Sequence, residues 1–208
     1  MILYLDTSTS LFVTGIVDKN KLIAFIKEPL GSLMSEIAMD KLTTMFKNND
    51  INPKEIKKII VVNGPGSFTG IRIGVTIAKT YAWSINVPII QISGLKAMAV
   101  STDDDSYLVP IIDARRDFVY AAIYTPDKKE VLSPKHIEIK VLKEQLSELN
   151  EFHIVTNDEI NIQANKVKYD PDILKIVEFF KDDTASNPHM VNPDYLKLTE
   201  AEENKDSK

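Results

Sequence analysis

Two aspartates, Asp6 and Asp113, each end an apolar run and begin a short polar turn. A carboxylate in this position can hold Mg²⁺ and a nucleotide phosphate, so the pair, with Thr7 and Ser8, would form a cofactor-binding cleft. Alternatively, each aspartate caps its own turn by accepting hydrogen bonds from nearby backbone N–H groups. The Ser8 side chain obstructs the approach of a phosphate to the backbone, and no glycine cluster follows residue 94. The sequence therefore favours capping aspartates over a nucleotide-binding pair.

No other set of side chains matches a catalytic or metal-binding pattern. The chain has no cysteine, which excludes disulfides, thiolate metal ligands and cysteine nucleophiles. His136, His153 and His189 are too widely spaced to place two imidazoles on one helix face. Ser67 has no recognisable histidine partner, so we interpret it as a helix N-cap. We therefore predict neither a catalytic residue nor a metal site.

The stretch VNGPGSFTGIRIG, residues 62–74, holds four of the seven glycines of the chain. A glycine-rich turn between a strand and a helix often binds phosphate on backbone N–H groups. This turn lacks the Lys-Ser or Lys-Thr pair of a P-loop, and its GxGxxxG spacing does not match the dinucleotide fingerprint. Its glycines therefore need another explanation.

Small residues recur at every fourth position from the start of the following helix, which places them on one helix face. They are Gly66, Gly70, Gly74, Ala78 and Ala82. Two glycines inside a helix cost about 1–2 kcal/mol relative to alanine, and a close backbone contact would offset this cost. The contact is either with the preceding helix of this chain or with a partner subunit. We expect a partner interface formed by Met34, Ala38, Leu42, Gly70, Arg72, Gly74 and Ala78.

Two consequences of this interface are open to test. A bulky side chain in place of Gly74 is expected to abolish partner binding while the monomer stays folded. Arg72 either contacts a partner carboxylate or a nucleic-acid phosphate, or remains a solvated charge.

The chain consists of two related halves. Apolar and polar residues alternate around turns in residues 2–28, which predicts hairpin-connected strands, and the stretch from Leu108 repeats this outline. Placing Asp6 on Asp113 also superimposes the turns, which indicates a structural duplication. Helical apolar spacing lies between the copies, at residues 32–47 and 67–84. We expect an N-terminal lobe at residues 1–100, a shortened C-terminal lobe at 101–198 and a charged, disordered tail at 199–208.

The composition is that of an ordinary globular protein. A net charge of −5 does not favour a direct grip on nucleic acid or on an anionic membrane. No apolar run reaches the roughly 18 residues that a membrane span needs, and the first residues do not resemble a signal peptide. We therefore expect a cytoplasmic protein with no membrane contact.

Four stretches together resemble one family. LYLDTSTS, NGPGSFTGIRIGVTIAKTYA, PIIDARRDFVYAAIY and PDYLKLTEAE are similar to the TsaB (YeaZ) family, and they span nearly the whole chain. The resemblance implies an α/β fold of two duplicated lobes, the actin-like and sugar-kinase (ASKHA) fold. It also implies a role in forming threonylcarbamoyladenosine (t6A) in ANN-decoding tRNAs.

The resemblance further implies partners and a division of labour. In the family, TsaD holds the metal and transfers the threonylcarbamoyl group, TsaE is an ATPase, and TsaB is a degenerate, non-enzymatic scaffold. TsaB pairs with TsaD, or with itself as a homodimer, through the two N-lobe helices, here residues 32–47 and 67–84. It contacts tRNA only through the complex. No resident cofactor is implied, apart from an ATP or ADP at an interface shared with TsaD.

The sequence departs from the family in two places. Met34-Ser35 stands where many relatives have a His-Ser pair, and residues 148–184 match relatives poorly.

The alternative function is an independent ATP-dependent enzyme of the actin and sugar-kinase superfamily. It predicts Mg-dependent nucleotide turnover that Asp6→Asn abolishes. A peptidase directed at TsaD is a third hypothesis, which no set of residues supports.

Overall fold

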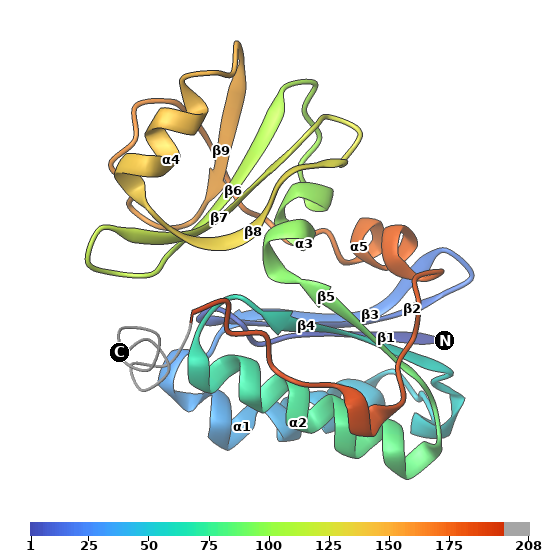
Figure 1. Ribbon diagram of the computed structural model, residues 1–208. Helices are drawn as coiled ribbons and strands as arrows, with labels where there is room; N and C mark the ends of the chain where they lie inside the picture. The colour runs from blue at the N-terminus through green and yellow to red at the C-terminus, as the bar shows by residue number, and fades with distance from the viewer. Residues whose placement is uncertain (198–208) are drawn as a thin grey trace.

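The computed structural model describes residues 1–197 of the chain, so the tail predicted at residues 199–208 lies outside the described residues. Two five-stranded sheets and their helices form five layers (Figure 1). Helices α1 and α2 cover the outer face of the first sheet, α3 and α5 lie between the sheets, and α4 covers the second sheet. None of the helices in residues 1–197 is long and apolar enough to cross a membrane.

The first sheet is mixed. Its strands lie in the order β3 (Lys21–Pro29), β2 (Leu11–Asp18), β1 (Ile2–Asp6), β4 (Lys58–Gly64) and β5 (Ile89–Ser93). Strands β1, β2 and β3 pair antiparallel, whereas β4 pairs parallel with both β1 and β5. These three strands confirm the hairpin-connected strands predicted for residues 2–28.

The second sheet repeats this topology. Its order is β8 (Glu130–Glu138), β7 (Phe118–Tyr124), β6 (Tyr107–Asp113), β9 (Phe152–Thr156) and β10 (Asn165–Lys168), with the same strand directions. Asp6 ends β1 and Asp113 ends β6, so the predicted duplication is confirmed. Asp6 pairs with Val13 but Asp113 with Val119, and the second hairpin loop is therefore one residue shorter.

Both faces of the first sheet are buried, which explains why β1 is apolar almost throughout. Leu3 and Leu5 point into the core beneath α1 and α2, whereas Tyr4 packs on the other face with α5. Successive side chains of a strand point to opposite faces, so an unbroken apolar run is expected where both faces are covered.

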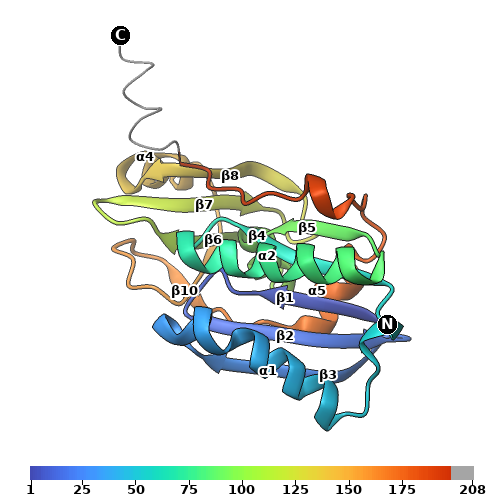
Figure 2. The same ribbon diagram turned by 90° about the horizontal axis from the view of Figure 1, so that it is seen from below.

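The two N-lobe helices lie side by side on the first sheet (Figure 2). Helix α1 spans Met34–Asn48 after a 3-10 turn, η1 (Gly31–Leu33), and has no side-chain cap at its start. Helix α2 spans Phe68–Ile85. Ser67 is its N-cap, as predicted, because the Ser67 hydroxyl accepts a hydrogen bond from Gly70 N–H at 3.3 Å.

Helix α3 (Gly94–Ser101) joins the lobes and packs on both. Ala97 and Val100 belong to the core of the first sheet, and Leu95 and Met98 to the core of the second. An apolar helix with no polar face is expected where both sides are buried. In the second lobe, α4 (Ile139–Leu146) buries Leu142 and Leu146.

The chain after the second sheet returns to the first lobe. Helix α5 (Ile173–Phe180) packs on the first sheet through side chains that include Ile176 and Val177, although the sequence places residues 101–198 in the second lobe. The remaining segment passes through η3 (Pro188–Met190) and lies along α2. The apolar stripe of α5 predicts burial but does not tell which sheet covers it. The boundary at residues 100 and 101 stays a prediction.

Candidate functional site

A cleft of about 740 Å³ opens between the lobes. The first lobe contributes residues 8–11 and the start of α2 at residues 66–69, and the second lobe contributes residues 112–115, Asp158 and Tyr169. Its size falls in the range of small-molecule sites. Of the four residues predicted for a nucleotide cleft, Ser8 and Asp113 line this cleft, whereas Asp6 and Thr7 do not.

Asp6 is buried and bonded within its own turn. Its Oδ1 accepts hydrogen bonds from the Ser8 N–H at 2.8 Å and from the Ser8 hydroxyl at 2.7 Å, and Tyr4 donates to Oδ2 at 3.5 Å. Burial raises the pKa of Asp6, and the hydrogen bonds from Ser8 and Tyr4 oppose that shift. The geometry supports the capping interpretation rather than a carboxylate pair across the cleft.

Asp113 is exposed at the cleft and also caps its turn. Its Oδ1 accepts a hydrogen bond from Arg115 N–H at 2.9 Å, and its own N–H donates to Asp158 Oδ2 at 2.8 Å. Within residues 1–197, no group of three or more His, Cys, Asp or Glu side chains is arranged to hold a metal ion. The two aspartates therefore share a capping role despite their different burial.

The glycines of α2 face the first hairpin of the same chain. A Cβ on Gly70 would lie 2.1 Å from the Thr7 carbonyl oxygen, and a Cβ on Gly74 would lie 2.4 Å from Thr7 Oγ1. A Cβ on Gly66 would lie 2.2 Å from the Ser8 carbonyl oxygen. The close contact that these glycines permit in this chain is therefore with its own hairpin, which neither of the two predicted contacts, the preceding helix or a partner subunit, anticipates.

Hydrogen bonds hold the helix and the hairpin together. Thr7 Oγ1 donates to the Gly70 carbonyl at 2.7 Å, and Ser67 N–H donates to the Ser8 carbonyl at 2.7 Å. Thr7 and Ser8 are both buried, so the side chains considered for phosphate binding serve this packing. The glycines permit a backbone approach that any side chain would block.

Most of the residues predicted for the partner interface are internal. Met34, Ala38, Leu42, Gly70, Gly74 and Ala78 are buried in this chain's own core or against its own hairpin. Because Gly74 faces Thr7, a bulky substitution there would crowd the first hairpin, which argues against the expectation that the monomer stays folded. Of the predicted set, Arg72 alone is exposed.

The outer face of α1 and α2 carries exposed apolar side chains that the sequence interpretation did not single out. Leu33, Met39 and Phe68 are 49–53% exposed. We call this surface, with Arg72, the α1–α2 face. Met39 follows buried Ala38 on α1 and therefore points away from the core, and helical spacing alone can identify such an outward position.

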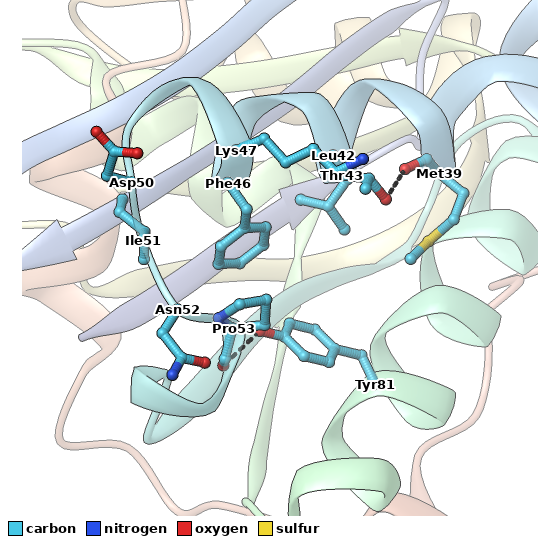
Figure 3. A pocket seen from close by; sticks show the side chains of 10 residues that line it. All are labelled: Met39, Leu42, Thr43, Phe46, Lys47, Asp50, Ile51, Asn52, Pro53 and Tyr81. Carbon is cyan, nitrogen blue, oxygen red and sulfur yellow. Dashed lines mark hydrogen bonds between the residues drawn. The ribbon is translucent and has the colours of Figure 1, made fainter.

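Two hollows mark the α1–α2 face, and Met39 lines both. One, of about 420 Å³, lies beside Phe68, Arg72 and Ile73. The other, of about 590 Å³, lies between the end of α1, η2 (Pro53–Glu55) and α2 (Figure 3). There the rings of Phe46 and Tyr81 pack edge to face with their centroids 6.0 Å apart, and the Tyr81 hydroxyl donates a hydrogen bond to the Pro53 carbonyl at 2.7 Å.

The duplicated sheets and the cleft between them define a two-lobe α/β protein of the actin-like and sugar-kinase (ASKHA) fold, as the sequence predicts. YeaZ from Pseudomonas aeruginosa has this fold, with a TM-score of 0.79 at 17% identity over 94% of this chain and 99% of that one. The family model "TsaD: tRNA N6-adenosine threonylcarbamoyltransferase" matches residues 32–172.

Curated relatives narrow the assignment. The tRNA threonylcarbamoyladenosine biosynthesis protein TsaB of Bacillus subtilis is 29% identical over 97% of this chain and 96% of its own. TsaB of Buchnera aphidicola is 25% identical over 77% of this chain and 80% of its own. The chain belongs to the TsaB (YeaZ) family, within the wider group that the TsaD model describes.

Proposed function

We propose that this chain is a non-catalytic scaffold subunit in the formation of threonylcarbamoyladenosine in tRNA. It binds TsaD and, together with TsaE, enables TsaD to transfer the threonylcarbamoyl group to the adenosine of ANN-decoding tRNAs in the cytoplasm. The chain contacts tRNA only through the complex. In the absence of TsaD, two copies pair through the same surface.

The observation that carries this proposal is the α1–α2 face. Helices α1 and α2 lie side by side on one side of the molecule (Figure 2). Exposed Met39 on α1 and exposed Phe68 on α2 line one hollow, and exposed Leu33 ends the 3-10 turn just before α1. Contiguous apolar surface of this kind marks sites of protein association. Ala38, Leu42 and Ala78, on the same two helices, are buried in this chain's own core, which supports the face from below.

The family model supports TsaD as the partner. The match begins at residue 32, just before α1, and includes all of α2. TsaD therefore has counterparts of these two helices and can present a matching pair to the α1–α2 face. Two related surfaces that pack about an approximate two-fold axis place equivalent helices in contact.

The cleft supports an independent ATP-dependent enzyme, the alternative function, less well than the α1–α2 face supports a scaffold. Such an enzyme needs a carboxylate free to hold Mg²⁺ near the phosphates. Asp6 is instead buried, with its Oδ1 engaged by Ser8. A nucleotide at an interface shared with TsaD stays a prediction.

The proposal is tested by placing a charge on the α1–α2 face. Met39→Asp is expected to weaken binding to TsaD at least tenfold, about 1.4 kcal/mol, because the carboxylate is desolvated against apolar side chains. Binding is measured by calorimetry with purified TsaD. Val131→Asp is the matched control, since Val131 is 53% exposed on β8 of the other lobe and Met39 is 51% exposed.

Both variants alter exposed side chains, so both are expected to unfold at the wild-type temperature. Equal affinity of wild type and Met39→Asp for TsaD would contradict the proposal. A loss of binding by Val131→Asp with intact Met39→Asp would move the interface to the second lobe.

A further inference from the structure

Residues 187–197 form a segment, here called the arm, that lies along the first lobe and is hydrogen-bonded to it. Asp194 N–H donates to the Asn63 carbonyl at 2.7 Å, and Asn63 Nδ2 donates to the Asn192 carbonyl at 3.0 Å. Lys79 Nζ donates to the Val191 carbonyl at 2.7 Å. Gly64 admits the arm, because a Cβ there would lie 1.9 Å from the Asp194 carbonyl oxygen. These contacts fix the arm across β4 and α2.

The arm places Tyr195 on the first turn of α2. The Tyr195 ring stacks on Phe68, with centroids 4.9 Å apart and planes 28° apart. The Tyr195 hydroxyl accepts a hydrogen bond from Arg72 Nε at 2.8 Å. The Arg72 guanidinium also lies 4.2 Å from the centroid of the Phe68 ring. Two rings and one hydrogen bond therefore hold a guanidinium in one orientation.

Arg72 is one of the residues that line the hollow between α1 and α2. The residues around it are Ser35, Ala38, Met39, Phe68, Thr69, Ile73, Thr76 and Ile77. Arg72 is the one charged residue in this lining, and no carboxylate of residues 1–197 forms an ion pair with it. With Nε bonded to Tyr195, the two terminal nitrogens remain for a planar, two-pronged acceptor.

We propose that Tyr195 is a positioning residue that fixes Arg72 as the receptor for a carboxylate side chain of the protein that covers the α1–α2 face. This inference rests on the proposed function, which makes that protein TsaD. A single arginine in a neutral and apolar lining fits one buried ion pair. An RNA backbone is bound by several basic groups, which this hollow does not offer.

The inference predicts coupling between the two side chains. Tyr195→Phe keeps the ring stack but removes the hydroxyl, and it is expected to weaken TsaD binding about 3- to 10-fold. Arg72→Met is expected to weaken it about 10-fold or more and to reduce its salt dependence. The double variant is expected to bind no more weakly than Arg72→Met alone, because the hydroxyl acts through the guanidinium. A merely structural hydroxyl would give additive losses.

Calorimetry with purified TsaD at two salt concentrations measures these affinities, and thermal unfolding confirms that each variant is folded. Tyr107→Phe on β6 of the other lobe is the matched control and is expected to bind as wild type. Wild-type affinity of Tyr195→Phe, or additive losses in the double variant, would overturn the inference while leaving the proposed function intact. Unchanged TsaD affinity of Arg72→Met with weakened tRNA binding would assign Arg72 to RNA and also overturn it. Failure of the wild-type chain to bind TsaD would overturn the proposed function and this inference together.

Discussion

Single residues in this chain serve the packing of the first lobe where a sequence pattern suggests ligand binding. Asp6, Thr7 and Ser8 stand where a phosphate-binding hairpin would need them, yet all three are buried and bond to one another or to α2. Asp113 ends the equivalent strand of the second lobe and caps its turn at a solvent-exposed position. The same residue type at duplicated positions thus keeps a local role, turn capping, that does not depend on a nucleotide.

The glycines of α2 that face the first hairpin give a prediction at the residue scale. Gly70→Ala is expected to lower the free energy of unfolding by about 1–3 kcal/mol, because the new methyl group would lie 2.1 Å from the Thr7 carbonyl oxygen. Thermal or urea unfolding measures the change. Thr76→Ala, at an exposed position of the same helix, is the control and is expected to stay within about 0.5 kcal/mol of wild type. A fully stable Gly70→Ala that no longer binds TsaD would restore the idea of a ridge reserved for a partner.

At the scale of elements, the sequence predicts those parts whose pattern is strong. The paired hairpins, the helices near residues 32–47 and 67–84, and the Ser67 cap follow from apolar spacing and turn residues. Strands β8 and β10 do not, because they lack the regular inward and outward alternation of β3: β8 buries one residue, near its end, and β10 buries none. Thr7, which contacts Gly70 on α2, lies more than 60 positions away from it along the chain, and spacing along one helix cannot identify such a contact.

The connector between α3 and β6 gives a prediction at the element scale. Asp104 accepts hydrogen bonds from the Ser106 hydroxyl at 2.5 Å and the Ser106 N–H at 2.8 Å, and it contacts His153 Nδ1 on β9 at 2.5 Å. Led by the Ser106 hydroxyl, these contacts lower the pKa of Asp104 from 3.8 to about 2. A carboxyl group whose pKa is lower in the folded chain than in the unfolded chain stabilises the fold at pH values above the unfolded-state pKa. This contribution is lost as the pH falls towards 2.

Asp104→Asn is therefore expected to cost about 1 kcal/mol at pH 7, the net value of a typical hydrogen bond. The difference from wild type is expected to shrink between about pH 4 and pH 2, where the wild-type carboxylate becomes protonated. Urea unfolding across this pH range measures the difference. A gap that stays constant down to pH 2 would show that the Asp104 charge does not stabilise the connector.

At the scale of the whole molecule, the chain has two surfaces with different properties. The cleft between the lobes has the shape of a ligand site, but the candidate carboxylate Asp6 is buried away from it. The α1–α2 face is apolar, exposed and flanked by the arm that holds Arg72. Family resemblance and apolar spacing point to these two helices as the interface. Helical spacing can identify an outward position such as Met39, but the partners of the buried side chains depend on packing against the first sheet and its hairpin, which the sequence alone does not give.

The central claim is that the chain supports tRNA modification through the α1–α2 face and not through its cleft. It is tested most directly by a threonylcarbamoylation assay with purified TsaD, TsaE and tRNA. We predict that Met39→Asp reduces t6A formation about fivefold or more when subunit concentrations are near the wild-type Kd, as a tenfold loss of affinity requires. We also predict that Asp113→Asn, in the cleft, leaves t6A formation within twofold of wild type. Full activity of Met39→Asp together with loss of activity in Asp113→Asn would contradict the account.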